Sequence, residues 1–223
     1  MNRIGWDPIW EEVFIQQEWG KYPGESLIRF IARNYYKLNR PDVKILEIGC
    51  GAGANIWYMS REGFDVYGID GSETAIGKAS QLLVDENLSA KLTVGDIIQL
   101  PYADGFFDAV VDVECICCNS INDSKKILSE VTRILKPSGQ FYSRTFSEKM
   151  YVGKQNFRIS ALEYNNISDG PLAGKGFVRL MDNESIDILY GSQFKILSID
   201  RSDITVSNGE VAISEWIIVS QKK

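Results

Sequence analysis

Residues 45–53 read ILEIGCGAG, and this stretch decides the fold. The run from Val43 to Ile48 is short and apolar and ends in glycines, which is typical of a buried strand. Glycines permit a tight turn and let backbone N–H groups approach a ligand closely. A helical stretch follows through about Glu62. We therefore predict a strand, a glycine turn and a helix N-terminus, whose positive dipole end suits an anionic group.

Strands and helices continue to alternate after this segment. We expect further strands at 65–69, 91–94, 107–113 and 140–146, one helix capped by Ser72 that runs to about Glu86, and another from near Asn122 that ends before Pro137. Such regular alternation predicts right-handed crossovers and a parallel sheet covered by helices on both faces.

The C-terminal part departs from this alternation. Residues 194–200 and 212–220 are predicted strands, separated by about a dozen polar residues that include Asn208-Gly209. Because no crossover helix fits between them, we expect an antiparallel hairpin. The predicted fold is a single α/β domain over residues 1–223, with a doubly wound, mostly parallel sheet of seven strands and a C-terminal antiparallel hairpin.

Two segments lie outside the alternating core. Residues 1–40 look helical and aromatic, with Trp6, Trp10 and Phe14 at positions i, i+4 and i+8. Helices packed on the sheet and a cap over a substrate both fit this segment. Residues 147–190 form an insertion between the fifth and sixth strands, and connections of this length often serve as lids.

Composition excludes several classes of protein. The chain has 223 residues, 44% of them hydrophobic, and 24 basic against 30 acidic residues give a net charge of −6. Disorder is excluded, and nucleic-acid binding is disfavoured. No apolar run approaches the roughly 18 residues of a membrane span, and the N-terminus lacks a signal peptide, so we expect a soluble cytoplasmic protein.

The inventory of reactive side chains is narrow. The chain has no histidine, which excludes imidazole catalysis, and the spacing of its four cysteines lacks the paired pattern of a zinc site. We therefore expect buried free thiols and no metal.

An acidic residue follows the glycine turn at the spacing that a nucleoside cofactor requires. Asp70 ends the second strand, about twenty residues on, where a carboxylate can accept hydrogen bonds from ribose hydroxyls. Both features lie at the carboxyl ends of strands, where ligands bind in open α/β sheets. We infer an adenosine-bearing cofactor. Gly49, Gly51 and Ala54 also satisfy the relaxed dinucleotide pattern, so a nicotinamide-dependent oxidoreductase remains an alternative.

Further motifs follow in a fixed order. With GID at 68–70, VGDIIQLPYADGFFDAVVD at 94–112 and ILKPSGQFY at 134–142, the chain resembles class I S-adenosylmethionine-dependent methyltransferases over about residues 43–146. The resemblance implies S-adenosyl-L-methionine as the cofactor. It places Glu47, Gly49, Gly51 and Gly53 beside the methionine part, Asp70 on the ribose, Gly71 at the adenosine edge, Asp96 and Ile97 at the adenine and Asp112 beneath the sulfonium. We add Tyr22, from the N-terminal segment, to the predicted cofactor-binding residues.

The acceptor side departs from several relatives of that family. The run after the fourth strand lacks the Asp/Asn-Pro-Pro-Tyr/Phe signature of enzymes that methylate adenine or glutamine nitrogens, and no Pro-Cys dipeptide marks a cytosine nucleophile. Methyl transfer needs chiefly alignment, while a hydroxyl acceptor gains from a general base. Glu114, beside the fourth strand tip, is the predicted base. Predicted substrate contacts are Trp10, Trp19, Cys117, Tyr151 and Phe157.

These observations predict methyl transfer to oxygen or nitrogen of a small polar metabolite, either sugar-like or an amine. A nicotinamide-dependent oxidoreductase and a non-catalytic cofactor-binding module are the alternatives. We expect a small-molecule substrate rather than nucleic acid or membrane, and the oligomeric state is left open.

Overall fold

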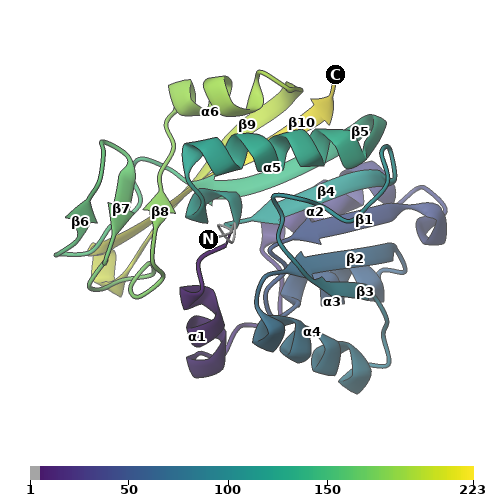
Figure 1. The fold of residues 1–223 in the computed structure, drawn as a ribbon, viewed down its shortest axis with the longest axis horizontal. Coiled ribbons are helices and arrows are strands. Elements are labelled where there is room, and N and C mark those ends of the chain that lie inside the picture. The colour runs from purple at the N-terminus through teal and green to yellow at the C-terminus, as the bar shows by residue number, and fades with distance from the viewer. Residues whose placement is uncertain (1–5) are drawn as a thin grey trace.

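The chain folds around one large sheet in a computed structural model that describes residues 6–223 (Figure 1). The strand order is β3-β2-β1-β4-β5-β10-β9. The strands are β1 (Lys44–Ile48), β2 (Asp65–Asp70), β3 (Lys91–Val94), β4 (Phe107–Val113), β5 (Leu135–Phe146), β9 (Phe194–Val206) and β10 (Val211–Lys222). Strand β10 runs antiparallel to both of its neighbours, and the pairs from β3 to β5 are parallel. The predicted fold class is confirmed.

Helices cover both faces of this sheet. One face carries α2 (Glu25–Tyr35), α3 (Ala54–Arg61) and α4 (Glu73–Asp85), and the other carries α5 (Ile121–Ile134) and α6 (Asn183–Tyr190). Successive strand residues point to opposite faces, so Ile45 packs with α2 and α3 while Leu46 packs with α5 and α6. This two-sided burial explains why β1 is apolar on both faces.

Helix starts follow the capping residues in the sequence. Ser72 is the N-cap of α4, and its hydroxyl accepts a hydrogen bond from the Ala75 amide at 3.0 Å, as predicted. Helix α5 is capped in the same way by Ser120, slightly earlier than we predicted, because that hydroxyl accepts from the Asp123 amide at 3.2 Å. None of the described helices combines the length and apolarity that crossing a membrane requires.

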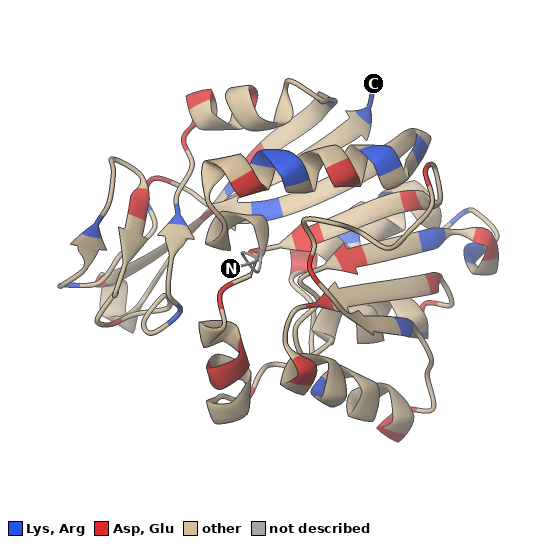
Figure 2. Ribbon diagram, in the orientation of Figure 1, with Lys and Arg blue, Asp and Glu red and all other residues tan. Residues whose placement is uncertain are grey.

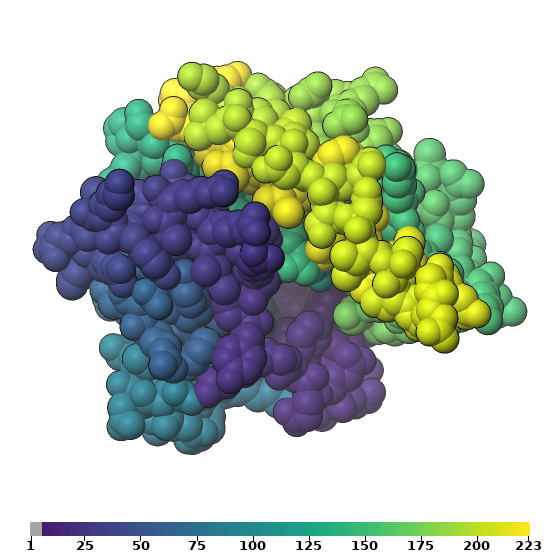
Figure 3. Space-filling model, turned by 180° about the vertical axis from the view of Figure 1, so that it is seen from behind, coloured from purple at the N-terminus to yellow at the C-terminus, as the bar shows by residue number. Residues whose placement is uncertain are grey.

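The C-terminal hairpin is longer than the sequence predicted. The polar residues expected to form a loop instead continue the two strands, and only Ser207–Gly209 and Glu210 separate them. The antiparallel ladder persists through pairs such as Val211 with Val206, beyond the helix-covered part of the sheet. Polar side chains are compatible with strand there because this end of the hairpin is largely exposed, and its tip projects from the body (Figure 3).

Different parts of the N-terminal segment pack in different places, and one of them packs on the sheet. Helix α2 packs on the sheet, whereas α1 (Ile9–Gln16) packs against α4. Trp6 precedes α1, which begins after Pro8, so the three aromatic residues of the predicted stripe do not share one helix. Residues 1–5 of the segment lie outside the described residues.

The predicted insertion holds a small sheet of its own. Strands β6 (Phe157–Arg158), β7 (Glu163–Asn165) and β8 (Val178–Arg179) pair antiparallel. Residues of β7 and β8 share an apolar cluster with Phe146 and Met150. The last part of the insertion is α6, which belongs to the main helical layer. The segment that stands apart from the sheet is therefore shorter than residues 147–190.

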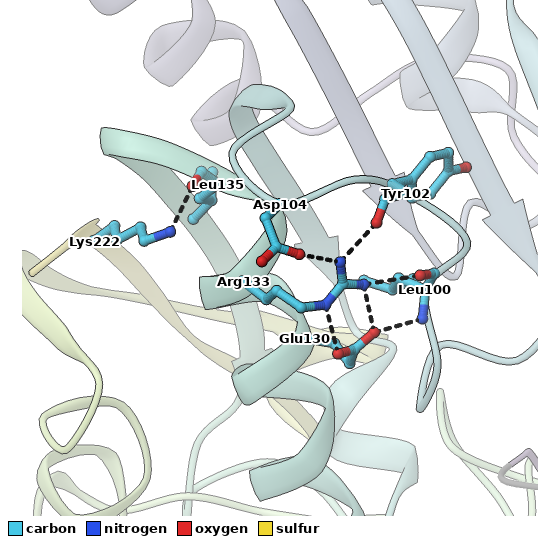
Figure 4. A network of polar contacts seen from close by, with 7 residues as sticks. All are labelled: Leu100, Tyr102, Asp104, Glu130, Arg133, Leu135 and Lys222. Atoms are coloured by element: carbon cyan, nitrogen blue, oxygen red, sulfur yellow. Dashed lines mark hydrogen bonds and ion pairs between the residues drawn. The ribbon is translucent and has the colours of Figure 1, made fainter.

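A network of hydrogen bonds from α5 fixes the loop between β3 and β4 (Figure 4). The Arg133 guanidinium donates to the carbonyls of Tyr102 at 2.7 Å and Leu100 at 2.9 Å and to the Asp104 carboxylate at 2.8 Å. Glu130 accepts from the same guanidinium and from the Leu100 amide at 2.8 Å. One α5 side chain therefore holds three positions of the loop that follows Ile97.

We expect Arg133→Met to lower the free energy of unfolding by about 1.5–3 kcal/mol, since loop acceptors lose a charged donor. Urea unfolding followed by circular dichroism measures it. Lys125→Met, at an exposed position of the same helix, serves as the control and should change the value by less than about 0.5 kcal/mol. Equal effects of the two substitutions would contradict the role of the network.

Candidate functional site

A cavity of about 390 Å³ lies at the carboxyl ends of the central strands. Its floor comes from the loops after β1, β2, β3 and β4, and its roof comes from residues 6–24 and the loop before β8. Seen from behind, the molecule is hollowed beside the N-terminal segment (Figure 3). Acidic positions mark the ends of β1, β2 and β4 that face α1 (Figure 2). The volume falls within the range of small-molecule sites, about 300–1,000 Å³.

The glycine turn after β1 fits closely against the next loop. Gly49 has φ of +63°, and a side chain there would come within 2.3 Å of the Cys115 sulfur. Glycine is therefore required at Gly49 both by backbone conformation and by space. The turn keeps its backbone at the cavity surface without side-chain interference.

Asp70 ties this turn to the start of α4. One carboxylate oxygen accepts from the Gly51 amide and the other from the Ser72 amide, each at 2.9 Å. The side chain is 8% exposed, and burial raises its pKa despite these hydrogen bonds. A carboxylate oxygen has more than one lone pair, so Asp70 keeps acceptor capacity toward the cavity.

Glu47 is a buried carboxylate at the cavity, and only part of its hydrogen-bonding capacity is used. The side chain is 2% exposed, and Asn55 from α3 donates to its Oε1. The other oxygen, Oε2, has no hydrogen-bond partner among the described residues. Burial raises the pKa of Glu47 to about 8. An unpartnered buried carboxylate oxygen is costly, and a cationic donor in the cavity would relieve it.

Asp112 supports the site from below. It is fully buried and accepts from the amides of Cys115 at 3.1 Å and Ile116 at 3.0 Å, and from the Ser143 hydroxyl at 2.6 Å. Burial raises its pKa to about 6. Asp112 therefore shapes the loop after β4, and its carboxylate is bonded within the protein.

Glu114 belongs to an ion cluster at the cavity wall. Nη2 of Arg144 donates to Glu114 at 2.7 Å and to Glu215 at 2.8 Å. Glu114 has φ of +60°, an uncommon conformation for a residue with a side chain, and its amide donates to the Arg144 carbonyl at 2.8 Å. Burial and the neighbouring Glu114 carboxyl raise the pKa of Glu215 to about 7.

Aromatic side chains of the N-terminal segment form part of the roof. The rings of Trp10 and Trp19 lie 6.5 Å apart, and Phe14 lies 5.1 Å from Trp19. Glu11 holds this segment down because its carboxylate accepts from the hydroxyls of Ser72 and Thr74 at the start of α4. The roof therefore rests on the same helix that Asp70 links to the glycine turn.

Comparison with known proteins gives the family. Residues 46–143 match the model described as a methyltransferase domain. A sterol 24-C-methyltransferase of Gibberella zeae is 34% identical over 126 residues, 53% of this chain and 33% of that protein. Norajmaline N-methyltransferase of Rauvolfia serpentina is 28% identical over 128 residues, 56% of this chain and 43% of that protein. An S-adenosylmethionine-dependent methyltransferase structure from Methanosarcina mazei has a TM-score of 0.73 at 23% identity and covers 86% of this chain and 96% of that one.

The chain carries a class I S-adenosylmethionine-dependent methyltransferase domain. The family resemblance seen in the sequence is thereby confirmed, and S-adenosylmethionine is the cofactor of this domain. The chain spans 33% of the length of the Gibberella relative and 43% of the Rauvolfia relative.

Most of the site residues that were predicted from the sequence line the cavity. These are Glu47, Gly49, Gly51, Asp70, Gly71, Ile97, Glu114, Trp10, Trp19 and Tyr22. The structure thus brings the predicted glycine turn, both strand-end carboxylates and three predicted roof aromatics around one space. Tyr22 stands at the rim, 75% exposed, with its ring edge-on to Trp57 at 5.5 Å.

Three predicted substrate contacts, Cys117, Tyr151 and Phe157, do not line the cavity. Cys117 is fully buried in the apolar cluster of the insertion, while its neighbour Cys118 lines the cavity. Tyr151 donates to Asp169 at 2.7 Å within the insertion. Phe157 is 61% exposed on β6. The sequence could not show which residues of a long insertion turn inward.

Three predicted cofactor residues also lie outside the lining. Gly53 is the N-cap of α3 with φ of +87°, and a side chain there would meet Ala79 at 2.7 Å. Asp96 accepts from the Ile98 amide at 2.9 Å in the loop after β3. Asp112 points into the protein, as described above. These residues shape the loops around the cavity.

Several residues that line the cavity were not predicted from the sequence. Arg144 and Asn55 were not singled out, nor was Lys175, which lies 5.3 Å from the Trp19 ring. A signal for Arg144 existed, because a charged residue within the buried strand SRTF needs a partner. The loop that carries Lys175 has no comparable signal.

Proposed function

We propose that this protein transfers a methyl group from S-adenosylmethionine to oxygen or nitrogen of a small polar metabolite. The observation that supports it best is the pair of buried carboxylates, Glu47 and Asp70, at one cavity. The unpartnered Oε2 of Glu47 fits an ammonium group, and the remaining acceptor capacity of Asp70 fits ribose hydroxyls. These are the polar groups that the cofactor carries at its two ends.

The proposed roles of the protein's residues follow from this fit. When bound, the cofactor supplies an electrophilic methyl group on a sulfonium. Glu47 would bind the amino group, Asp70 the ribose, and Ile97 the adenine by apolar contact, while the turn at Gly49 lets the backbone approach. The aromatic roof excludes water and limits the acceptor's positions, and such positioning can supply roughly 7–11 kcal/mol.

The acceptor end of the cavity supports a small polar molecule. Glu114, Asn119, Arg144 and Lys175 line the cavity together with apolar side chains, and in this proposal they serve the acceptor. The cavity of about 390 Å³ is roofed by aromatic side chains, which favours a small acceptor. The relatives act on carbon in one case and nitrogen in the other, judging by their names. A carbon acceptor is therefore the second candidate, favoured by the 34% identity to the sterol enzyme.

Titration of the purified protein tests the cofactor. Trp6, Trp10 and Trp19 line the cavity, so S-adenosylhomocysteine should change the tryptophan fluorescence on binding. We expect Asp70→Ala to weaken this binding by about 1.5–3 kcal/mol, the range for hydrogen bonds to charged groups.

Asp65→Ala is the matched control for Asp70→Ala. It removes a carboxylate from the other end of the same strand and should leave the dissociation constant unchanged. Tight binding of NADH with none of S-adenosylhomocysteine would instead establish the nicotinamide alternative. Cofactor binding without any methylated product from metabolite extracts would favour a non-catalytic module.

A further inference from the structure

The charges around the cavity are unequal. Among residues 6–223, four carboxylates line it, those of Asp7, Glu47, Asp70 and Glu114, against two cationic side chains, Arg144 and Lys175. In the proposed function Glu47 and Asp70 serve the cofactor. That leaves Asp7 and Glu114, and of these Glu114 belongs to the ion cluster with Arg144, whose charges bear on which acceptor can bind.

The ion cluster at that end contains more negative than positive groups. One nitrogen of Arg144 holds both Glu114 and Glu215, so two carboxylates share a single guanidinium. Glu215 is 11% exposed and Glu114 is 30% exposed. The carboxylate that faces the cavity is thus Glu114, and a second cation would complete its pairing.

The backbone holds Glu114 toward the cavity at some conformational cost. A non-glycine residue with φ of +60° lies in a sparsely populated backbone region and persists where its surroundings require it. Here the Arg144 carbonyl accepts from the Glu114 amide, and the guanidinium of the same residue binds its side chain. Arg144 therefore holds both the backbone and the side chain of Glu114.

The walls around this carboxylate favour a cation over an anion. Trp10, Trp19 and Phe146 line the same cavity, and aromatic faces attract ammonium groups. The Lys175 ammonium already lies 5.3 Å from the Trp19 ring centroid, which shows that this ring accepts a cationic neighbour. An anionic acceptor would instead meet the Glu114 carboxylate, and Arg144, the cation beside it, is already bonded to both Glu114 and Glu215.

We propose that the methyl acceptor is an amine that enters as an ammonium ion, with Glu114 as its counter-ion and Arg144 and Glu215 as positioning residues. This inference rests on the proposed function. Glu114 binds the ammonium and accepts one of its protons, which leaves a neutral nitrogen with a free electron pair at the cavity. Glu215 keeps Arg144 in place behind it.

Three probes of one skeleton test the proposal: benzylamine, benzyl alcohol and benzoate, each titrated calorimetrically into protein saturated with S-adenosylhomocysteine. We expect benzylamine to bind at least about tenfold more tightly than the other two. Glu114→Gln should remove this preference by weakening benzylamine alone. Glu148→Gln, which removes a carboxylate paired with Arg201 outside the cavity lining, should retain the preference.

The outcomes separate the two proposals. Failure of the unaltered protein to bind S-adenosylhomocysteine overturns the proposed function and this inference with it. Binding of S-adenosylhomocysteine without a preference for benzylamine overturns the inference alone, as does tightest binding of benzoate. If Glu114→Gln weakens S-adenosylmethionine relative to S-adenosylhomocysteine while the benzylamine preference persists, Glu114 pairs with the sulfonium, and the acceptor assignment is wrong.

Discussion

Asp112→Ala is expected to destabilise the protein by about 3–5 kcal/mol, because it removes the acceptor of three buried or partly buried donors. The amides of Cys115 and Ile116 and the hydroxyl of Ser143 all bond this carboxylate. Each of the two amides left unpaired costs about 1–3 kcal/mol. The loss of bulk at a fully buried position adds a cavity. Thermal and urea unfolding measure the change.

Asp112→Asn provides a matched control for this prediction. Both amides donate to the same oxygen, Oδ1, which asparagine retains. The Ser143 hydroxyl also lies 2.9 Å from the Tyr190 hydroxyl, so it keeps a partner. We expect a loss of about 1 kcal/mol for Asp112→Asn. If alanine and asparagine destabilise equally, the hydrogen bonds to Oδ1 do not hold the loop after β4.

The sequence predicted the central sheet because its signals there are local. The apolar run at residues 43–48 must be buried on both faces, and Ser72 and the glycine turn mark helix starts by their own hydrogen bonding and conformation. The positions of Glu47, Gly49 and Asp70 follow directly, since the carboxyl ends of neighbouring parallel strands meet at one edge. These parts of the candidate site depend on topology alone.

The acceptor end could not be predicted in the same way because it depends on tertiary packing. Whether Cys117 or Cys118 faces the cavity is decided by the apolar cluster that buries Cys117. Tyr151 and Phe157 looked suitable by residue type, but Phe157 lies on β6 of the small sheet and Tyr151 donates to Asp169 within the insertion. Arg144 entered the site because β5 places it between Glu114 and Glu215, a pairing across three strands that no short motif records.

Glu47→Gln is expected to change the pH dependence of stability more than any other single substitution at the site. Burial raises the pKa of Glu47 to about 8 from an ordinary value near 4.5, so the folded protein binds this proton more tightly than the unfolded chain does. Stability therefore falls as pH rises from about 5 to 8. Glutamine does not ionise and retains the oxygen to which Asn55 donates.

Thermal unfolding at pH 5 and pH 8 measures this contribution as the difference between the two proteins. Between pH 5 and pH 8 the free energy of unfolding should fall by on the order of 3 kcal/mol less in the variant than in the original protein. This difference corresponds to about 6–12 °C in Tm. The original protein must be subtracted because Asp112 and Glu215 also have raised pKa values, about 6 and about 7. Both groups lower stability as pH rises, and they do so equally in the two proteins. Exposed Glu184→Gln should behave as the original.

The same substitution separates stability from cofactor binding. If Glu47 receives the cofactor's ammonium group, binding lowers its pKa and releases a proton near pH 7, so the affinity for S-adenosylhomocysteine rises with pH. Calorimetry in two buffers of different ionisation enthalpy should detect this proton for the original protein and none for Glu47→Gln. We also expect about a tenfold or greater loss of affinity, because a charged hydrogen bond is replaced by a neutral one. A variant that gains stability at pH 8 but binds with unchanged affinity and proton release would place the ammonium group away from Glu47.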